Sequence, residues 1–182
     1  NKVIIGIYSG MQDVAYFELA EKLSTILKTP IKLIGQSLYP NFAQNKNAKF
    51  LKKTYLLSIF ISIIILSGGI IFSDLLITLL GGENMSRASK IFQILIISII
   101  PVTTSLFFAN IVLTSWGYNK EFLKVRIYTN VFYIFIILFL YLFKSINLIN
   151  LAYTVVAVEF FAAIVSIIFT NKLNINFLQV YN

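Results

Sequence analysis

The sequence contains no cysteine and no histidine. Without cysteine it can form neither a disulfide framework nor a thiolate metal site, and without histidine it can form neither a Ser-His-Asp triad nor a histidine-ligated metal site. Acidic residues are also scarce, with 7 Asp and Glu against 15 Lys and Arg, and no motif of paired carboxylates is present. We therefore expect no catalytic residues, no metal site and no bound cofactor, in a protein that is not an enzyme.

Apolar residues, by contrast, are abundant. They make up 58% of the 182 positions, charged residues make up only 12%, and the mean hydropathy is +0.85. An average soluble domain has about one-quarter charged residues, so this is the composition of a membrane protein. The net charge of +8 does not indicate a nucleic-acid partner, because Lys and Arg lie mainly between the apolar runs, where membrane proteins carry them.

Apolar runs of membrane length predict five transmembrane helices, since about 20 apolar residues cross the hydrocarbon layer. The expected fold class is all-α, a polytopic membrane helical bundle. The expected spans are residues 4–38, 54–73, 91–115, 124–143 and 148–170. The chain begins with Asn1 and shows no signal-peptide pattern, which favours an internal fragment of a larger protein. No repeat or linker divides it, so residues 1–182 are expected to form one transmembrane unit.

The distribution of Lys and Arg predicts the orientation of the spans, because these residues stay mostly on the cytoplasmic side. The connections at residues 41–53 and 116–126 carry seven of them, whereas the alternate connections carry fewer and hold acids as well. We expect these two connections and the C-terminus to lie in the cytoplasm.

The first expected span differs from the others because it carries charges and Pro30, which is expected to kink or open the helix. At about 100° per residue, its polar side chains fall within one arc of roughly 120°. This polar stripe consists of Glu18, Glu21, Lys22, Thr25, Lys28, Thr29, Lys32 and Gln36. A charged side chain that faces lipid at mid-bilayer costs at least ~2.5 kcal/mol, so we expect the polar stripe to line a hydrated cavity.

Within the polar stripe, Lys28 and Lys32 stand one turn apart with the same charge and no acid near them on this helix, which suits an anionic ligand. The candidate substrate-binding residues are Lys22, Lys28, Lys32, Thr25, Thr29 and Gln36. Two other interpretations stay open. The helix could lie on the membrane surface with its polar side in water, or the lysines could pair with acids elsewhere in the parent protein.

Polar groups also interrupt the later spans. Glu159 lies inside the last span, where an ionisable side chain is expected to face the interior of the bundle. It is a candidate coupling acid, and a structural role for a buried, satisfied acid is an equal alternative. Pro101, with Thr103, Thr104 and Ser105 after it, predicts a kink whose freed carbonyls the hydroxyls help to satisfy. Helix packing alone would also explain these residues.

Four segments, taken in order, resemble a known group of transporters. They are VIIGIYSGMQDVAYF, GQSLYPNFAQ, LLITLLGGENMSRASKIFQIL and NIVLTSWGYNKEFLKV. They resemble the second half of the O-antigen and polysaccharide-unit flippases of the multidrug/oligosaccharidyl-lipid/polysaccharide exporter superfamily. In that family a Gly-x-Tyr-Ser start opens a polar helix, an apolar-Pro pair closes it, and a leucine-rich stretch ends in glycine. The matching residues here are Gly6-Ile7-Tyr8-Ser9, Leu38-Tyr39-Pro40 and Leu79-Leu80-Gly81.

The resemblance implies a parent with two six-helix bundles, in which the five expected spans are similar to those of the C-terminal bundle. It implies translocation of an undecaprenyl-pyrophosphate-linked oligosaccharide, an O-antigen or capsule repeat unit, across the bacterial inner membrane by alternating access. The lysines of the polar stripe would attract the pyrophosphate. Membrane lipid and other polysaccharide-assembly membrane proteins are the further partners that it implies.

Three alternatives stay open for the function. A small-solute exporter of the same superfamily would carry more acids in its cavity, and Glu159 keeps this alternative open. A membrane enzyme that acts on lipid-linked sugars, such as a polymerase or glycosyltransferase, needs an acid-base or metal site that the short loops do not offer. A structural subunit would use the polar stripe for ion pairs with a partner chain.

Overall fold

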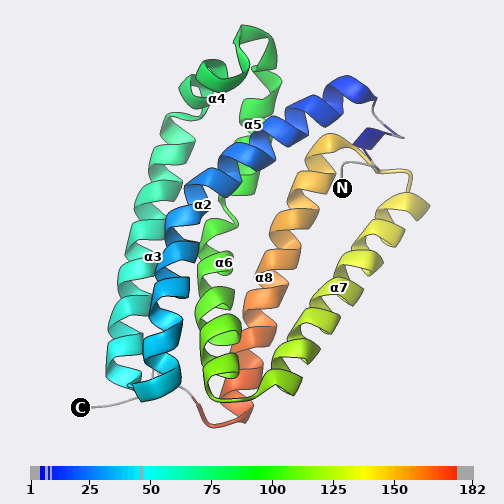
Figure 1. Ribbon diagram of the computed structural model, residues 1–182. Coiled ribbons are helices and arrows are strands. Elements are labelled where there is room, and N and C mark those ends of the chain that lie inside the picture. Colours follow the sequence, from blue (N-terminus) through cyan, green and yellow to red (C-terminus); the bar gives the residue numbers. More distant parts are fainter. Residues whose placement is uncertain (1–4, 7, 9, 46, 176–182) are drawn as a thin grey trace.

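The computed structural model describes residues 5, 6, 8, 10–45 and 47–175, and its regular elements are all helices (Figure 1). The long helices are α2 (Met11–Asn45), α3 (Ala48–Ile71), α7 (Asn119–Leu142) and α8 (Leu148–Lys172). The shorter ones are α4 (Ser73–Gly81), the 3-10 turn η1 (Glu83–Met85), α5 (Arg87–Ile96), α6 (Ile99–Ser105) and the π-helix η2 (Leu106–Leu113). The all-α fold class predicted from the sequence is confirmed.

Four helical segments in the described part of the chain are long and apolar enough to cross a membrane. Three are α3, α7 and α8, and the fourth runs through α5, α6 and η2 as the span Arg87–Leu113. They correspond to the last four expected spans. α3, α5 and α7 begin several residues before the expected limits, because the polar residues ahead of each apolar run continue the helix. These four helices indicate a membrane protein.

The helix α2 occupies the place of the first expected span. Its 35 residues make it roughly 52 Å long at 1.5 Å per residue. α2 is not one of the four apolar segments, because its charged side chains make it too polar. That α2 crosses a membrane therefore stays a prediction. Pro30 and Pro40 lie inside α2, and each removes one backbone hydrogen bond. The helix continues through both, and Figure 1 shows that it changes direction along its length.

Some expected features lie outside the described residues. Ile4, Ile7 and Ser9 belong to the first expected span, and Ile7 and Ser9 are also part of the motif Gly6-Ile7-Tyr8-Ser9. Lys46 belongs to the connection at residues 41–53, and residues 176–182 form the C-terminus.

Local sequence signals explain where several helices begin and end. Asn47 and Asn147 precede α3 and α8, and their side-chain oxygens accept hydrogen bonds from the backbone N–H groups three residues ahead. Such caps satisfy N–H groups that the first helical turn leaves without partners. α4 ends at Gly81, and Gly82 has a φ of +79°, which glycine adopts at little cost. The leucine-rich stretch that ends in glycine thus forms a short helix with a glycine stop.

The span Arg87–Leu113 is broken between α5 and α6, at Ile97 and Ser98. The break lies four residues before Pro101, which has no N–H to give to the Ile97 carbonyl. Proline is tolerated in the first turn of a helix, and Pro101 lies in the first turn of α6. The kink predicted at Pro101 is thus found just ahead of it.

Two apolar clusters join the helices at opposite ends of the bundle. The first cluster joins the N-terminal part of α2 to α4, α5 and the start of α8, around Phe17, Phe92 and Leu151. The second joins the C-terminal part of α2 to the start of α3 and to η2, around Phe42 and Phe107. The middle of α2 lies between these clusters and contributes few residues to either.

The outer faces of α3 and α7 leave large apolar side chains exposed, among them Phe60 and Ile64 on α3 and Ile134, Phe135 and Leu138 on α7. A soluble protein rarely exposes so many contiguous apolar side chains. In a membrane these faces contact lipid.

Two adjacent glycines near the end of α3 face different surroundings. A Cβ at Gly69 would lie 3.3 Å from Ile96 Cγ1 and 3.5 Å from Phe92 Cζ, whereas a Cβ at Gly68 would meet nothing within 4 Å. We expect Gly69→Leu to force α3 away from α5 and to destabilise the bundle by about 1–3 kcal/mol, the usual range for overpacking. Gly68→Leu is the matched control and should leave stability near that of the wild type.

Thermal unfolding of the purified protein in detergent measures this difference. Equal melting temperatures for the two variants would contradict the close packing of α3 on α5.

Candidate functional site

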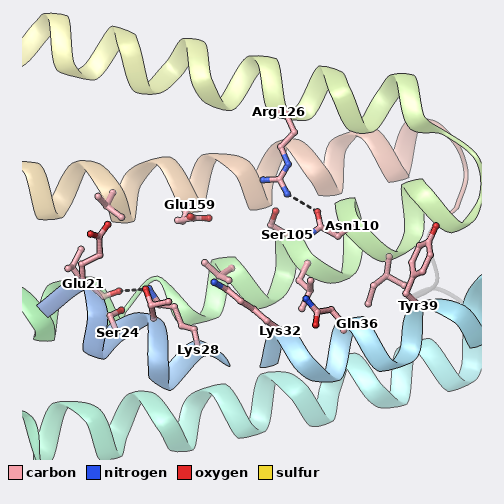
Figure 2. A pocket seen from close by; sticks show the side chains of 17 residues that line it. Glu21, Ser24, Lys28, Lys32, Gln36, Tyr39, Ser105, Asn110, Arg126 and Glu159 are labelled. Atoms are coloured by element: carbon pink, nitrogen blue, oxygen red, sulfur yellow. Dashed lines mark hydrogen bonds between the residues drawn. The ribbon is translucent and has the colours of Figure 1, made fainter. Parts of the chain in front are cut away.

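A polar cavity of about 530 Å³ lies between the middle of α2 and the helices α5, α6, η2, α7 and α8 (Figure 2). Its lining residues are Glu21, Ser24, Thr25, Lys28, Lys32, Gly35, Gln36, Tyr39, Leu95, Val102, Ser105, Leu106, Asn110, Ile111, Arg126, Val155 and Glu159. Along α2 it reaches from Glu21 to Tyr39, roughly 27 Å at 1.5 Å per residue. That length is close to the ~30 Å thickness of a hydrocarbon core.

The structure brings four of the six predicted substrate-binding residues together in this cavity, namely Thr25, Lys28, Lys32 and Gln36. It places the other two, Lys22 and Thr29, outside the lining, both exposed. The Thr29 hydroxyl instead donates to the Thr25 carbonyl oxygen at 2.9 Å.

Lys22 and Thr29 lie outside because the face of α2 that lines the cavity is rotated relative to the predicted polar stripe. The lining residues of α2 extend from Ser24 and Gly35 on one side to Gln36 on the other. At 3.6 residues per turn this arc is shifted by about 40° from the arc of the polar stripe. Lys22 and Thr29 lie on the edge that the shift leaves outside.

Lys28 is held at the break between α5 and α6. Its Nζ donates hydrogen bonds to Ser98 Oγ at 2.7 Å and to the Leu95 carbonyl oxygen at 3.2 Å. The Ser98 hydroxyl in turn donates to the same Leu95 oxygen at 2.6 Å. The charge at a half-buried lysine is thereby stabilised by polar groups that a regular helix would not present.

Four other charged side chains line the cavity together with Lys28, namely Glu21, Lys32, Arg126 and Glu159. Figure 2 shows Glu159 on α8 and Arg126 on α7 across the cavity from Lys28 and Lys32. The Glu159 carboxylate carries the charge opposite to that of Lys28, Lys32 and Arg126. In the described part of the chain, neither Glu159 nor Lys32 makes a hydrogen bond or an ion pair within 4.0 Å. Together with Glu21, these residues give the cavity one net positive charge.

By sequence, Arg126 is one of the basic residues of the connection at 116–126, near the end of a span. α7 begins at Asn119, so Arg126 lies two turns inside the helix and reaches the cavity. Its Nη2 donates to Asn110 Oδ1 at 2.8 Å, and its guanidinium lies 5.1 Å from the centroid of the Phe122 ring. Both contacts hold the cation at the cavity wall.

The π-helix η2 explains why Asn110 lines the cavity. Val102, Leu106 and Asn110 are lining residues, whereas Ala109 is buried in a separate apolar cluster with Val125 and Val165. In a regular α-helix, position 109 would follow 102 on one face, and the wider turn of a π-helix gives that place to position 110. π-Helical turns are frequent at functional sites.

Sequence reasoning missed Ser24, which is only 1% exposed and has an Oγ without a hydrogen-bond partner among the described residues. The available signal was its spacing, since residue 24 lies one helical turn before Lys28. Within the described residues, His, Cys, Asp and Glu form no group of three or more that could hold a metal ion.

Taken together, the fold and the cavity define a helical membrane-type bundle with a cationic polar cavity between its helices. Comparisons of the chain with protein-family models, with curated proteins and with solved structures find no match. The resemblance to polysaccharide-unit flippases therefore stays a prediction that rests on sequence motifs.

A cysteine introduced into a hydrated cavity reacts faster with a charged thiol reagent than a cysteine on a lipid-facing surface, because the reactive thiolate forms in water. The sequence has no cysteine of its own. We expect Gln36→Cys, in the cavity, to be labelled at least about tenfold faster than Leu57→Cys. Leu57 is 56% exposed on the outer face of α3, so it is the matched control for a side chain in lipid.

Labelling is measured in native membranes with a cationic methanethiosulfonate. Similar rates at the two positions would show that the cavity is not hydrated in the membrane.

Proposed function

We propose that this chain belongs to a membrane transporter that translocates an undecaprenyl-pyrophosphate-linked oligosaccharide, such as an O-antigen or capsule repeat unit, across the bacterial inner membrane. The observation that carries this proposal is the cationic cavity, which runs along α2 for nearly the thickness of a hydrocarbon core. The sequence resemblance to polysaccharide-unit flippases supports the same function.

The cavity offers the two kinds of contact that such a ligand needs. Lys28, Lys32 and Arg126 supply positive charge for a pyrophosphate. Gln36 and Tyr39 supply an amide and a phenol for sugar hydroxyls and sugar rings. Lys32, Gln36, Tyr39 and Arg126 are exposed, so a ligand can reach them from outside the helix bundle, while its prenyl chain stays in the bilayer.

Alternating access requires an element that can bend, and the break between α5 and α6 supplies one. Breaks of this kind, next to a proline, are where helices bend most easily. The break contacts Lys28 directly, so bending there would move a cation of the cavity.

Transport rather than catalysis is proposed because the connections between the long helices are short. The segment between α3 and α5 is folded as α4 and η1, and five residues, 143–147, join α7 to α8. None of them forms a loop large enough to build an enzyme site at the membrane face.

We propose that the α2–α3 connection, the η2–α7 connection and the end of α8 face the cytoplasm. Figure 1 shows these three places at the same end of the bundle. The basic residues beside them include Lys49, Lys52, Lys53, Lys120, Lys124 and Lys172, which suits the cytoplasmic side.

The test of the proposal is the variant Lys28→Ala/Lys32→Ala in the full-length protein, expressed in cells that lack their own copy. We expect surface polysaccharide to fall by about tenfold or more, because two of three cavity cations are lost. Lipid-linked oligosaccharide should accumulate at the same time. The readouts are surface polysaccharide and the pool of lipid-linked oligosaccharide, at equal protein abundance in the membrane.

Lys22→Ala is the matched control, since Lys22 is an exposed lysine of the same helix outside the cavity. Wild-type export by the double variant would refute the cationic cavity as the path of the ligand.

A second candidate function, export of a small solute driven by a proton or cation gradient, is favoured by the position of Glu159 among cavity cations. An acid inside a bundle can carry a proton across. If Glu159 couples transport to a proton gradient, Glu159→Gln should lower gradient-driven export about tenfold while ligand binding is kept. Glutamine has the size of glutamate but has no carboxyl group that can bind and release a proton.

Export with and without a protonophore, and ligand binding to the purified protein, separate these effects. Glu83→Gln, an exposed acid in η1, is the control. Unchanged, gradient-dependent export by Glu159→Gln would rule out a coupling role for this residue.

A further inference from the structure

The Lys28 ammonium has a defined number of free hydrogen-bond donors. An ammonium carries three N–H groups, and two of them are used by Ser98 Oγ and the Leu95 carbonyl oxygen. One N–H is left for a ligand, and Lys28 lines the cavity. The anchor itself is rigid, because Ser98 is completely buried and its own hydroxyl proton is given to the Leu95 oxygen.

A second donor lies one helical turn away. Ser24 is only 1% exposed, lines the same cavity, and has a hydroxyl with no hydrogen-bond partner among the described residues. Residues four apart on a helix lie on the same face, and Figure 2 shows Ser24 and Lys28 as neighbours on α2. A buried hydroxyl without a partner is unfavourable, and a bound ligand oxygen would satisfy it.

We propose that Ser24 and Lys28 form a subsite for one phosphate group of an anionic ligand, and that Ser98 is the positioning residue that holds Lys28 in place. In this subsite the remaining N–H of Lys28 and the Ser24 hydroxyl donate to phosphate oxygens. The proposal rests on the proposed function and makes it more specific, because it assigns the phosphate to one end of the α2 face and leaves Gln36 and Tyr39 to the sugars.

The difference between Lys28 and Lys32 supports this assignment. Lys32 is exposed and, within the part of the chain that the structure describes, has no hydrogen-bond partner. It must lose side-chain freedom when it binds a ligand, whereas Lys28 has already lost it. Lys28 is therefore the cation that is preorganised for a phosphate.

The alternative is that Lys28 and Ser98 only tie α2 to the break between α5 and α6. In that case Ser98→Ala would lower stability but would not weaken ligand binding through Lys28. The two roles are separated by measuring ligand binding and thermal unfolding on the same variants.

The first experiment measures binding of undecaprenyl pyrophosphate to the full-length protein in phosphatidylcholine nanodiscs, with undecaprenol as the ligand that lacks phosphates. We expect Ser24→Ala to weaken binding of the pyrophosphate by about tenfold and to leave undecaprenol unaffected. Ser58→Ala is the matched control. Ser58 is also a buried serine whose hydroxyl has no partner among the described residues, but it lies on α3 outside the cavity. Equal affinities of the two variants for the pyrophosphate would overturn the subsite.

The second experiment tests the positioning role of Ser98. Ser98→Ala should weaken pyrophosphate binding about three- to tenfold, and Ser98→Thr, which keeps the hydroxyl, should restore it. In a Lys28→Ala background, Ser98→Ala should cause no further loss, because its effect passes through Lys28. Additive losses in that background would overturn the positioning role.

Phosphatidylglycerol in the nanodiscs distinguishes the source of the phosphate. Competition by this lipid at the wild-type protein, lost in Ser24→Ala, would support the subsite with a phospholipid headgroup as its ligand and would argue against the proposed function. If Lys28→Ala/Lys32→Ala leaves export intact, the proposed function fails. If that variant loses export while Ser24→Ala binds normally, only the subsite fails.

Discussion

The charged face of α2 cannot be left in hydrocarbon, and the packing of the other helices follows from this constraint. The break between α5 and α6 presents Ser98 and the Leu95 carbonyl to Lys28. α8 and α7 bring Glu159 and Arg126 to the opposite wall. Apolar clusters close the bundle on both sides of the cavity. Without these groups the half-buried ammonium of Lys28 would have no polar partner, which is costly for a charge.

Composition and run length were sufficient to predict the all-α fold, because a chain in a membrane has few other ways to satisfy its backbone. The limits of the helices were less accessible. Lys52 and Lys53 lie inside α3, and Lys120 and Lys124 lie inside α7, since lysine is a good helix former although it ends an apolar run. Pro101 gave the kink, but the π-helix Leu106–Leu113 left no mark in the sequence that composition or periodicity could detect.

The candidate site shows what the periodicity of one helix can predict. It grouped Thr25, Lys28, Lys32 and Gln36 because they share a face of α2. It could not determine which edge of that face the neighbouring helices cover, so Lys22 was included and Ser24 was missed. Arg126 and Asn110 come from other helices, and their approach to α2 depends on tertiary packing, which no single-helix pattern contains.

Because of the π-helix, the chemistry of the cavity depends on how many residues this segment contains as well as on which residues they are. Its wider turn puts an amide at the cavity wall where an α-helix would put the methyl group of Ala109, and that amide holds the guanidinium of Arg126. Loss of one residue from 111–113 would restore an α-helix in which Ala109 takes the place of Asn110 at the cavity wall, whereas the residues after the loss would keep their direction. Related chains could thus exchange a polar wall for an apolar one through one indel, with no substitution at any lining position.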